Sequence, residues 1–255
     1  MKTFIVIPAY NEAKNIGIVV RSIQLVMPEA IIVVVSDGSH DDTVGVARQA
    51  GAIALAMPYN VGIGGAVQTG LLLAVNAGAD YVVRMDGDGQ HLPDYILPLL
   101  QPLIADRVDV AIGSRFYEGA PKIDVSLPRK IGITLFSLLT SILSGNTVRD
   151  PTSGFIAMNA KVAAFLAGNI TQDYPEVDGR VLLARVGFRS VEIPVTMNPR
   201  IHGVSSINTW RAFYYLLKVT LCLFVARSRE ITVSGLDLPF HKGKRENKHA
   251  EQPAI

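Results

Sequence analysis

The first half of the chain alternates between short apolar runs and longer amphipathic segments. The short runs are rich in β-branched residues and predict strands over residues 3–7, 30–35, 52–56, 80–85 and 109–113. Between them, apolar residues recur about every 3.6 positions, which predicts helices, for example over residues 12–26 and 64–76. Apolar strands separated by helices are typical of a mostly parallel sheet that is covered by helices on both faces. We therefore expect an α/β fold.

The alternation weakens after Gly113. The elements expected there are a loop with Gly and Pro over 114–128, an apolar helix over 131–143, a turn-rich stretch over 145–154, a helix over 174–186, a strand over 190–196 and an amphipathic helix over 207–229. The last segment, 230–255, is polar and basic, and we expect it to be a disordered tail. The sequence thus predicts one domain over residues 1–229.

Composition narrows the classes of function. A formal net charge of +2, without a basic patch interleaved with aromatic residues, argues against nucleic-acid binding. The chain is 49% hydrophobic, but it lacks an uninterrupted apolar run of about 18 residues, so we expect contact with a membrane surface and not a membrane span. The single cysteine, Cys222, excludes an intrachain disulfide. Pro8 cuts the first apolar run too short for a signal peptide, so we expect a cytoplasmic location.

Polar motifs follow four of the predicted strands, over residues 8–12, 36–42, 59–65 and 86–91. In sheets of this kind, ligands bind beyond the carboxyl ends of the strands. The four motifs are therefore expected to meet in one crevice.

The motif after the fourth strand carries the strongest chemical signal. Asp86 and Asp88 are two residues apart, so in an extended backbone their carboxylates point to the same side, while Gly87 and Gly89 let the main chain bend toward a ligand. Two carboxylates this close repel each other unless a cation or a proton intervenes. The motif indicates a hard divalent cation on a phosphate-bearing substrate, and a surface turn is the alternative.

The other strand-end motifs allow two interpretations each. Tyr10 could stack on a nucleotide, or Asn11 could simply cap a helix. Asp37 could accept hydrogen bonds from a base or ribose, whereas Asp41 or Asp42 is better explained as a helix cap.

The glycine-rich loop at Gly62 permits close approach to a nucleotide, or serves only tight packing. Val67 occupies the third glycine position of a dinucleotide-binding fingerprint, and the loop follows the third strand, so a Rossmann dehydrogenase is excluded.

Taken together, the ordered motifs resemble family 2 glycosyltransferases of the GT-A fold, and within them the dolichol-phosphate mannose synthase-like branch. The resemblance covers residues 2–229 and rests on Ile7-Pro8-Ala9-Tyr10-Asn11-Glu12, Ser36-Asp37-Gly38-Ser39 with Asp41-Asp42-Thr43, Asn60-x-Gly62-x-Gly64, Asp86-Gly87-Asp88-Gly89-Gln90-His91, and Gly113-Ser114-Arg115-Phe116. One departure is Ile63, which stands where the family commonly has a lysine between two glycines.

The resemblance implies roles for individual residues. Those implied for the nucleotide sugar are Pro8, Tyr10, Glu12, Asp37 and Gly62, together with Arg200 and Ser205 of a loop over 200–207 that closes over the diphosphate. Asp86 would face the donor, and Asp88 and Gln90 would hold Mg²⁺ or Mn²⁺ on the diphosphate. Arg115 would lie near the donor phosphates or the acceptor.

The acceptor side is less determined. Residues 174–178 resemble a Tyr-Pro-Glu-x-Glu stretch of bacterial surface-polysaccharide enzymes, so Glu176 and Asp178 are candidates for a base, or else charges favoured at a helix N-terminus. Arg129 and Lys130 directly precede the apolar segment 131–143, which suits a polyprenyl phosphate at a membrane surface. An ordinary buried helix with a basic start is the alternative.

We therefore expect an inverting transferase that moves a sugar from a nucleotide diphosphate sugar to a polyprenyl phosphate at the cytoplasmic face of a membrane. A separate membrane-protein partner is compatible with this location. The alternative acceptor is a hydroxyl of a glycan or a lipid-linked sugar. A nucleotidyltransferase and a non-catalytic adaptor are the alternatives from other classes. A nucleotidyltransferase normally carries its glycine-rich loop after the first strand, where this chain has Pro8 to Glu12. A non-catalytic adaptor would tolerate loss of the Asp86 and Asp88 pair, and this chain retains the pair.

Overall fold

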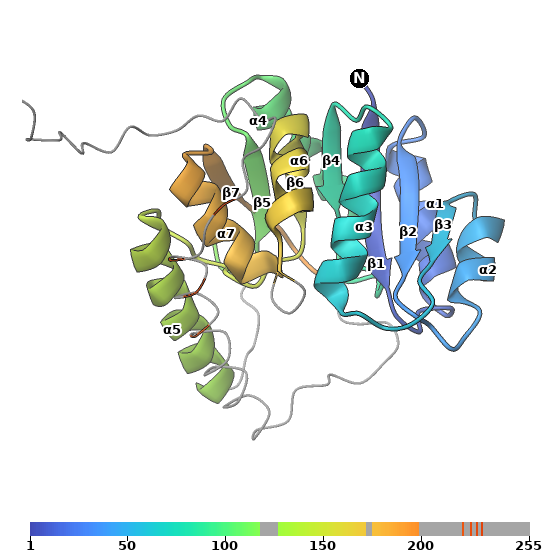
Figure 1. The fold of residues 1–255 in the computed structure, drawn as a ribbon, viewed down its shortest axis with the longest axis horizontal. Coiled ribbons are helices and arrows are strands. Elements are labelled where there is room, and N and C mark those ends of the chain that lie inside the picture. Colours follow the sequence, from blue (N-terminus) through green and yellow to red (C-terminus); the bar gives the residue numbers. More distant parts are fainter. Residues whose placement is uncertain are drawn as a thin grey trace, which may run out of the picture.

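A computed structural model describes residues 1–117, 127–171 and 175–198, together with Leu221, Val225, Ser228 and Ile231; for residues 127–131 it describes the backbone alone. A seven-stranded sheet forms the centre, with the strands in the order β3-β2-β1-β4-β6-β5-β7 (Figure 1). The strands are β1 (Thr3–Ala9), β2 (Ile31–Ser36), β3 (Ile53–Ala56), β4 (Tyr81–Arg84), β5 (Val110–Ser114), β6 (Ile156–Asn159) and β7 (Ser190–Pro194). All six predicted strands are present, and no strand end differs from its predicted position by more than two residues. The mostly parallel α/β fold is confirmed.

Strand β6 runs against its neighbours and was not predicted. It pairs antiparallel with β4 on one side and with β5 on the other, whereas every other strand pair of this sheet is parallel. Because of this reversal, the loop that leads into β6 reaches the same edge of the sheet as the carboxyl ends of β4 and β5. Residues from two distant parts of the sequence can therefore meet there.

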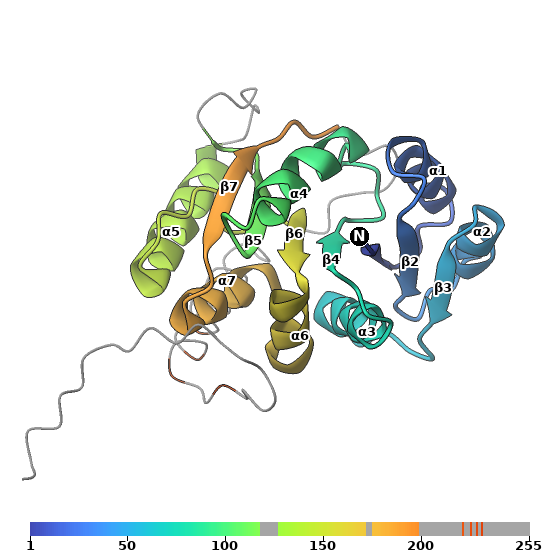
Figure 2. The same cartoon turned by 90° about the horizontal axis from the view of Figure 1, so that it is seen from above.

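Helices cover both faces of the sheet (Figure 2). One face packs against α1 (Ile16–Val26), α2 (Thr43–Gln49) and α4 (Ile96–Ile104), and the other against α3 (Ile63–Asn76), α6 (Ala160–Asn169) and α7 (Pro175–Val186). The alternation of side chains in β1 explains how one strand serves both cores, because Ile5 and Ile7 enter the first and Phe4 and Val6 enter the second. A 3₁₀ helix over Pro93–Tyr95 precedes α4.

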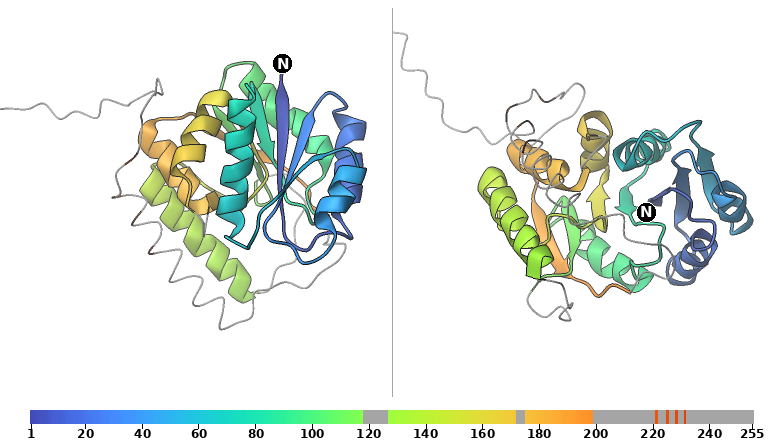
Figure 3. Two further views of the ribbon diagram at one scale, coloured as in Figure 1. Left: turned by 45° about the vertical axis from the view of Figure 1, so that its right-hand side comes forward. Right: turned by 90° about the horizontal axis from the view of Figure 1, so that it is seen from below.

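Helix α5 (Leu127–Ser144) packs against α7 and stands beside the sheet (Figures 1 and 3). It begins four residues earlier than predicted, so that Arg129 and Lys130 belong to its first turn. Phe136 and Thr140 are buried, whereas Leu135, Leu138 and Ile142 are exposed on the outer side. Their spacing of three and four residues places these three side chains on one face of the helix.

None of the described helices is both long enough and apolar enough to cross a membrane. The predicted helix over 207–229 and the predicted tail over 230–255 lie outside the described residues, apart from the four single positions named above. Of these, Leu221 and Val225 are helical and exposed.

Candidate active site

The loops after β1 and β2 are tied together at the carboxyl edge of the sheet. The Glu12 N–H donates to Thr43 Oγ1 (2.9 Å), and the His40 N–H donates to Asn11 Oδ1 (2.8 Å). Asn11 has a left-handed backbone (φ 57°), and α1 begins only at Ile16, so Asn11 does not cap that helix. The N-cap residue of α2 is Asp42, whose side chain makes no capping hydrogen bond, whereas Oδ1 of the preceding Asp41 accepts the Thr43 N–H (3.1 Å).

Asp37 supports the glycine-rich loop. Its carboxylate is buried and accepts the N–H groups of Val61 (2.8 Å) and Gly62 (3.0 Å). Gly62 has a φ of 95°, which strains any residue with a Cβ, and it immediately precedes α3. The structure therefore gives Asp37 a definite part in shaping the loop, and contact with a base or ribose stays a prediction.

The remaining residues predicted to meet a nucleotide differ in accessibility. The Tyr10 ring is half exposed and lies in a T-shaped arrangement with the His40 ring, with 6.4 Å between the ring centroids. Glu12 accepts a hydrogen bond from Asn15 (2.6 Å), and Pro8 is buried in β1.

The two aspartates beyond β4 lie in different environments. Asp88 is only 5% exposed, and its Oδ1 accepts the N–H of Gln90 (3.1 Å), whereas the Asp86 side chain is 36% exposed. The main chain of Gln90 is held from the far side by the Asn198 N–H (2.9 Å). This contact fixes the aspartate loop against the segment that follows β7.

His91 orients Asp86 from one side. Its ring is buried and stacks on Phe155 at 4.8 Å, and its Nδ1 accepts the Asp86 N–H (3.0 Å). Burial lowers the pKa of His91 below its ordinary value, although the charges of Asp86 and Asp88 oppose the shift. The neutral ring therefore carries its proton on Nε2, which lies 3.8 Å from Asp86 Oδ2.

Arg84 approaches Asp86 from the other side. It is the last residue of β4, is 2% exposed, and its Nη2 lies 3.6 Å from Asp86 Oδ1. The same nitrogen forms a close ion pair with Glu176 Oε1 at the start of α7. Burial alone would lower the pKa of Arg84, but the charges of Glu176 and Asp86 raise it above its ordinary value. Sequence reasoning missed this contact, for which an arginine inside an otherwise apolar strand is the available signal.

Glu176 and Asp178 both lie in the first turn of α7, as the helix-terminus interpretation requires. Glu176 is committed to Arg84, and Asp178 is 1% exposed. Both environments argue against the alternative interpretation of these acids as a base that reaches an acceptor.

Arg115 follows β5 and is held by Asp150, which sequence reasoning missed. The guanidinium donates from Nε and Nη2 to the two oxygens of Asp150 (2.7 Å each), and the Arg115 N–H adds a third hydrogen bond (3.0 Å). Burial opposes the charge of Arg115, but the hydrogen bonds and charge of Asp150 raise its pKa. Asp150 itself is fully buried, and Arg115 holds its pKa below the ordinary range despite that burial.

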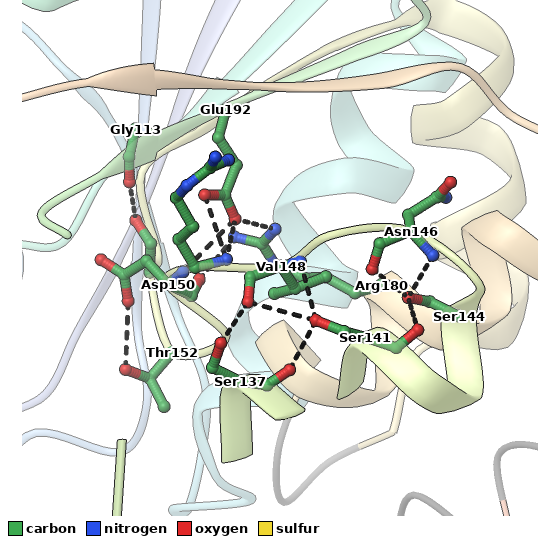
Figure 4. Close-up of polar contacts among 12 residues, drawn as sticks. Gly113, Ser137, Ser141, Ser144, Asn146, Val148, Asp150, Thr152, Arg180 and Glu192 are labelled. Carbon is green, nitrogen blue, oxygen red and sulfur yellow. Dashed lines mark hydrogen bonds and ion pairs between the residues drawn. The ribbon is translucent and has the colours of Figure 1, made fainter. Parts of the chain in front are cut away.

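Three further elements hold the chain around Asp150 (Figure 4). Arg180 of α7 donates to the Asp150 carbonyl (2.6 Å) and pairs with Glu192 of β7 (2.8 Å). Glu192 also accepts the Arg149 N–H (3.1 Å). On the side of α5, Ser137 donates to the Val148 carbonyl, and Ser141 accepts the Val148 N–H (2.9 Å).

The structure thus brings Asp86, Asp88, Gln90, Arg115 and Glu176 to one edge of the sheet, with Pro8, Tyr10, Glu12, Asp37 and Gly62 on the loops beside them. Arg200 and Ser205 lie outside the described residues. Arg129 and Lys130 are placed by their backbone at the start of α5.

The donor set of this edge suits a hard cation that is shared with a substrate. Asp88 and Gln90 offer oxygen ligands, which Mg²⁺ and Mn²⁺ prefer, and such ions commonly take only one or two protein carboxylates besides substrate phosphates. Within the part of the chain that the structure describes, no three His, Cys, Asp or Glu side chains gather into a metal-holding group. An ion held by Asp88 and Gln90 would share its remaining coordination positions with a substrate phosphate or water.

Comparison with known proteins agrees with this geometry. The sequence profile described as Glycosyl transferase family 2 matches residues 4–164. A UDP-N-acetylglucosamine–dolichyl-phosphate N-acetylglucosaminyltransferase of Methanococcus voltae is 30% identical over 241 residues, which cover 86% of this chain and 96% of the relative. An undecaprenyl-phosphate mannosyltransferase of Micrococcus luteus is 30% identical over 216 residues, or 82% and 88% of the two chains.

A similar solved structure is glucosyl-3-phosphoglycerate synthase of Mycobacterium tuberculosis, in complex with Mn²⁺, UDP-glucose and phosphoglyceric acid. The TM-score is 0.67 at 20% identity, and the match covers 92% of this chain and 82% of that one. This likeness confirms the predicted GT-A fold.

Proposed function

The chain belongs to glycosyl transferase family 2, and from this membership we propose that it transfers a sugar from a nucleotide diphosphate sugar to a polyprenyl phosphate at the cytoplasmic face of a membrane. Two relatives named above act on dolichyl phosphate and undecaprenyl phosphate, which supports this acceptor class.

The observation that carries the choice of acceptor is the position of the two acids of α7. A sugar hydroxyl must lose a proton as it attacks, so it calls for a base within hydrogen-bond reach. Glu176 is instead paired with buried Arg84, and Asp178 is buried. A phosphate monoester, with a second pKa of about 6, is largely ionised at neutral pH and attacks without a base.

Helix α5 supplies a second line of support. Its outer face carries exposed Leu135, Leu138 and Ile142, which suits contact with acyl or prenyl chains at a membrane surface. Its inner face is joined through Ser137 and Ser141 to the chain that leads to Asp150, the partner of Arg115. We propose that the lipid lies along α5 with its phosphate toward Arg115 and the start of α5, where Arg129 and Lys130 stand.

On the donor side, we propose that Asp88 and Gln90 hold Mg²⁺ or Mn²⁺, which would neutralise negative charge on the departing diphosphate. Tyr10 would lie against the nucleoside, and Asp37 would keep the glycine-rich loop open to the diphosphate through Gly62. The phosphate oxygen of the acceptor attacks the anomeric carbon while the bond to the diphosphate breaks, so direct displacement inverts that carbon. Arg115 keeps its guanidinium at this edge and stabilises the charge that develops there.

The nucleotide of the donor is identified first, from the melting temperature of the protein with each nucleoside diphosphate. The folded protein is heated with UDP, GDP, CDP or dTDP, each with Mg²⁺, with Mn²⁺ or with EDTA. Binding to the folded state alone raises the melting temperature by mass action, so the matching base with its ion should give the largest increase. The absence of any increase with every nucleotide would contradict the proposed function at its first step.

The acceptor is then tested by transfer. The purified protein is incubated with the radiolabelled nucleotide sugar, the divalent ion and undecaprenyl or dolichyl phosphate in detergent, and label is counted in the lipid phase. Undecaprenol, which lacks the phosphate, is the matched control and should remain unlabelled. Label on an oligosaccharide but not on the lipid phosphate would favour the hydroxyl acceptor, and release of pyrophosphate would indicate a nucleotidyltransferase.

The same assay tests the space behind Asp86. A Cβ added to Gly154 would lie 3.0 and 3.1 Å from the two oxygens of Asp86 and 3.2 Å from Arg84 Nη2. Because such contacts force the carboxylate to move, Gly154→Ala is expected to lower the transfer rate by about tenfold and stability by about 1 kcal/mol. Gly168→Ala, in α6 with nothing within 4 Å of the added Cβ, is the control and should leave transfer unchanged. Wild-type transfer by Gly154→Ala would show that Asp86 can shift freely.

A further inference from the structure

Arg84 is a charged residue inside the sheet. It belongs to β4, where Val82 and Val83 before it are fully buried, and its own side chain is 2% exposed. Taking a guanidinium out of water is costly unless it is paired. Its presence at the end of β4 therefore calls for an explanation beyond packing.

The pairing of Arg84 supplies that explanation. Its Nη2 contacts Glu176 Oε1 and also lies 3.6 Å from Asp86 Oδ1, so one nitrogen lies between two carboxylates. One of these carboxylates opens α7, and the other belongs to the aspartate loop of the candidate donor site.

Asp86 is restrained from three directions. Arg84 Nη2 lies 3.6 Å from Oδ1, and His91 Nε2 lies 3.8 Å from Oδ2. On the third side, a Cβ added to Gly154 would lie only 3.0 and 3.1 Å from the two oxygens. The side chain nevertheless keeps 36% of its surface exposed, so the carboxylate is accessible from outside the sheet. The carboxylate is thus presented to a ligand in one orientation.

We propose that Arg84 is a positioning residue for the donor site: it holds the Asp86 carboxylate in its ligand-facing orientation, and Glu176 of α7 in turn holds Arg84. Glu176 is then part of the support of the donor site and not an acceptor-side base. This inference rests on the proposed function for the kind of ligand, a nucleoside diphosphate, and on the described contacts for the roles of the residues.

The test removes the buried pair as a unit. Removing one partner alone would leave an uncompensated buried charge, whereas Arg84→Met with Glu176→Gln removes both charges and leaves the net charge unchanged. Binding of UDP and of GDP, each with Mn²⁺ and each with EDTA, is measured by calorimetry. We expect the pair variant to bind the preferred nucleotide with Mn²⁺ about tenfold more weakly than the wild type.

Arg189→Met is the control for loss of an ion-paired arginine. Arg189 pairs with Asp106 and Asp109 at the opposite edge of the same sheet, ahead of β5 and β7. The Arg189→Met variant should bind UDP and GDP as the wild type does. Wild-type affinity in the pair variant would overturn the inference, since Asp86 would then need no support from Arg84.

A cycle with Asp86 separates positioning from general weakening of the fold. In the background of Asp86→Asn, removing the Arg84 and Glu176 pair should change nucleotide affinity by less than about twofold, because residues that act through one another are not additive. A further tenfold loss in that background would show that Arg84 acts by another route, and the inference would be wrong.

Glu176→Gln alone keeps the proposal testable if the pair variant does not fold. Glutamine at position 176 still offers a hydrogen-bond acceptor to Arg84 but no charge. Among the described residues, the carboxylate then left beside Arg84 is that of Asp86. Asp86 is then drawn toward Arg84, and we expect about threefold weaker nucleotide binding with Mn²⁺. Unchanged binding would contradict the inference, whereas a wild type that binds no nucleotide would contradict the proposed function instead.

Discussion

Replacing Asp88 by asparagine is expected to lower the rate of sugar transfer by about a thousandfold or more while leaving the fold intact. Asparagine has the same shape and can still accept the Gln90 N–H, but it lacks the charge that the proposed ion requires. The rate is measured with lipid phosphate acceptor at saturating nucleotide sugar, and the melting temperature is followed in parallel.

Asp94→Asn is the matched control for Asp88→Asn, because Asp94 lies six residues further along the same segment and is exposed. It should transfer sugar at the wild-type rate. If Asp88→Asn retained wild-type transfer and still required a divalent ion, that ion would be held by other residues, and the role proposed for Asp88 would be wrong.

Removing the carboxylate of Asp150 should produce a large loss of stability. Asp150→Ala takes away three hydrogen bonds from Arg115 and leaves its largely buried guanidinium without its carboxylate. We expect the free energy of unfolding to fall by about 3–5 kcal/mol, as measured by urea denaturation. Asp106→Asn removes one partner of the half-exposed Arg189 and should change stability little, because Asp106 itself is exposed.

The contribution of Asp150 should depend on pH in a defined direction. Its pKa is lowered in the folded protein from the ordinary value of 3.8. A carboxylate of this kind stabilises the fold fully above its unfolded pKa, and the stabilisation is lost as the pH falls through the folded pKa. The difference between wild type and Asp150→Ala should therefore be constant near neutral pH and shrink below about pH 4. A difference that stayed constant down to pH 2 would contradict the ion pair as its source.

Most of the parallel part of the fold could be predicted from the sequence because its strands are short apolar runs next to amphipathic helices. The site residues at the ends of β1 to β4 followed for the same reason, since parallel strands deliver their carboxyl ends to one edge. Asp86 and Asp88 were recognisable locally, because their spacing alone brings the carboxylates together.

Strand β6 could not be recognised in this way. It is four residues long, follows a turn-rich stretch and runs straight into α6, so neither length nor periodicity separates it from its surroundings. Its position between β4 and β5 depends on long-range pairing that no local pattern encodes.

The ion pairs were missed for a related reason. Arg84 and Glu176 are 92 residues apart in the sequence, and Arg115 and Asp150 are 35 apart, so only the fold makes them neighbours. Sequence reasoning therefore considered Glu176 as a base and placed Arg115 near the donor phosphates or the acceptor without identifying the buried partner that holds each of them. A charged residue within an apolar strand is the feature that could have directed attention to such pairs.

The reversal of β6 also limits how this enzyme can be recombined with its relatives. The profile of the family ends at residue 164, which looks like a natural boundary for exchanging the following part of the chain. A crossover there would separate Asp150 from Arg180 and Glu192, whose side chains hold the loop that carries it. A crossover between β5 and α5 would instead separate Arg115 from Asp150. Any chimera with a new acceptor preference must therefore inherit β5 to β7 from a single parent.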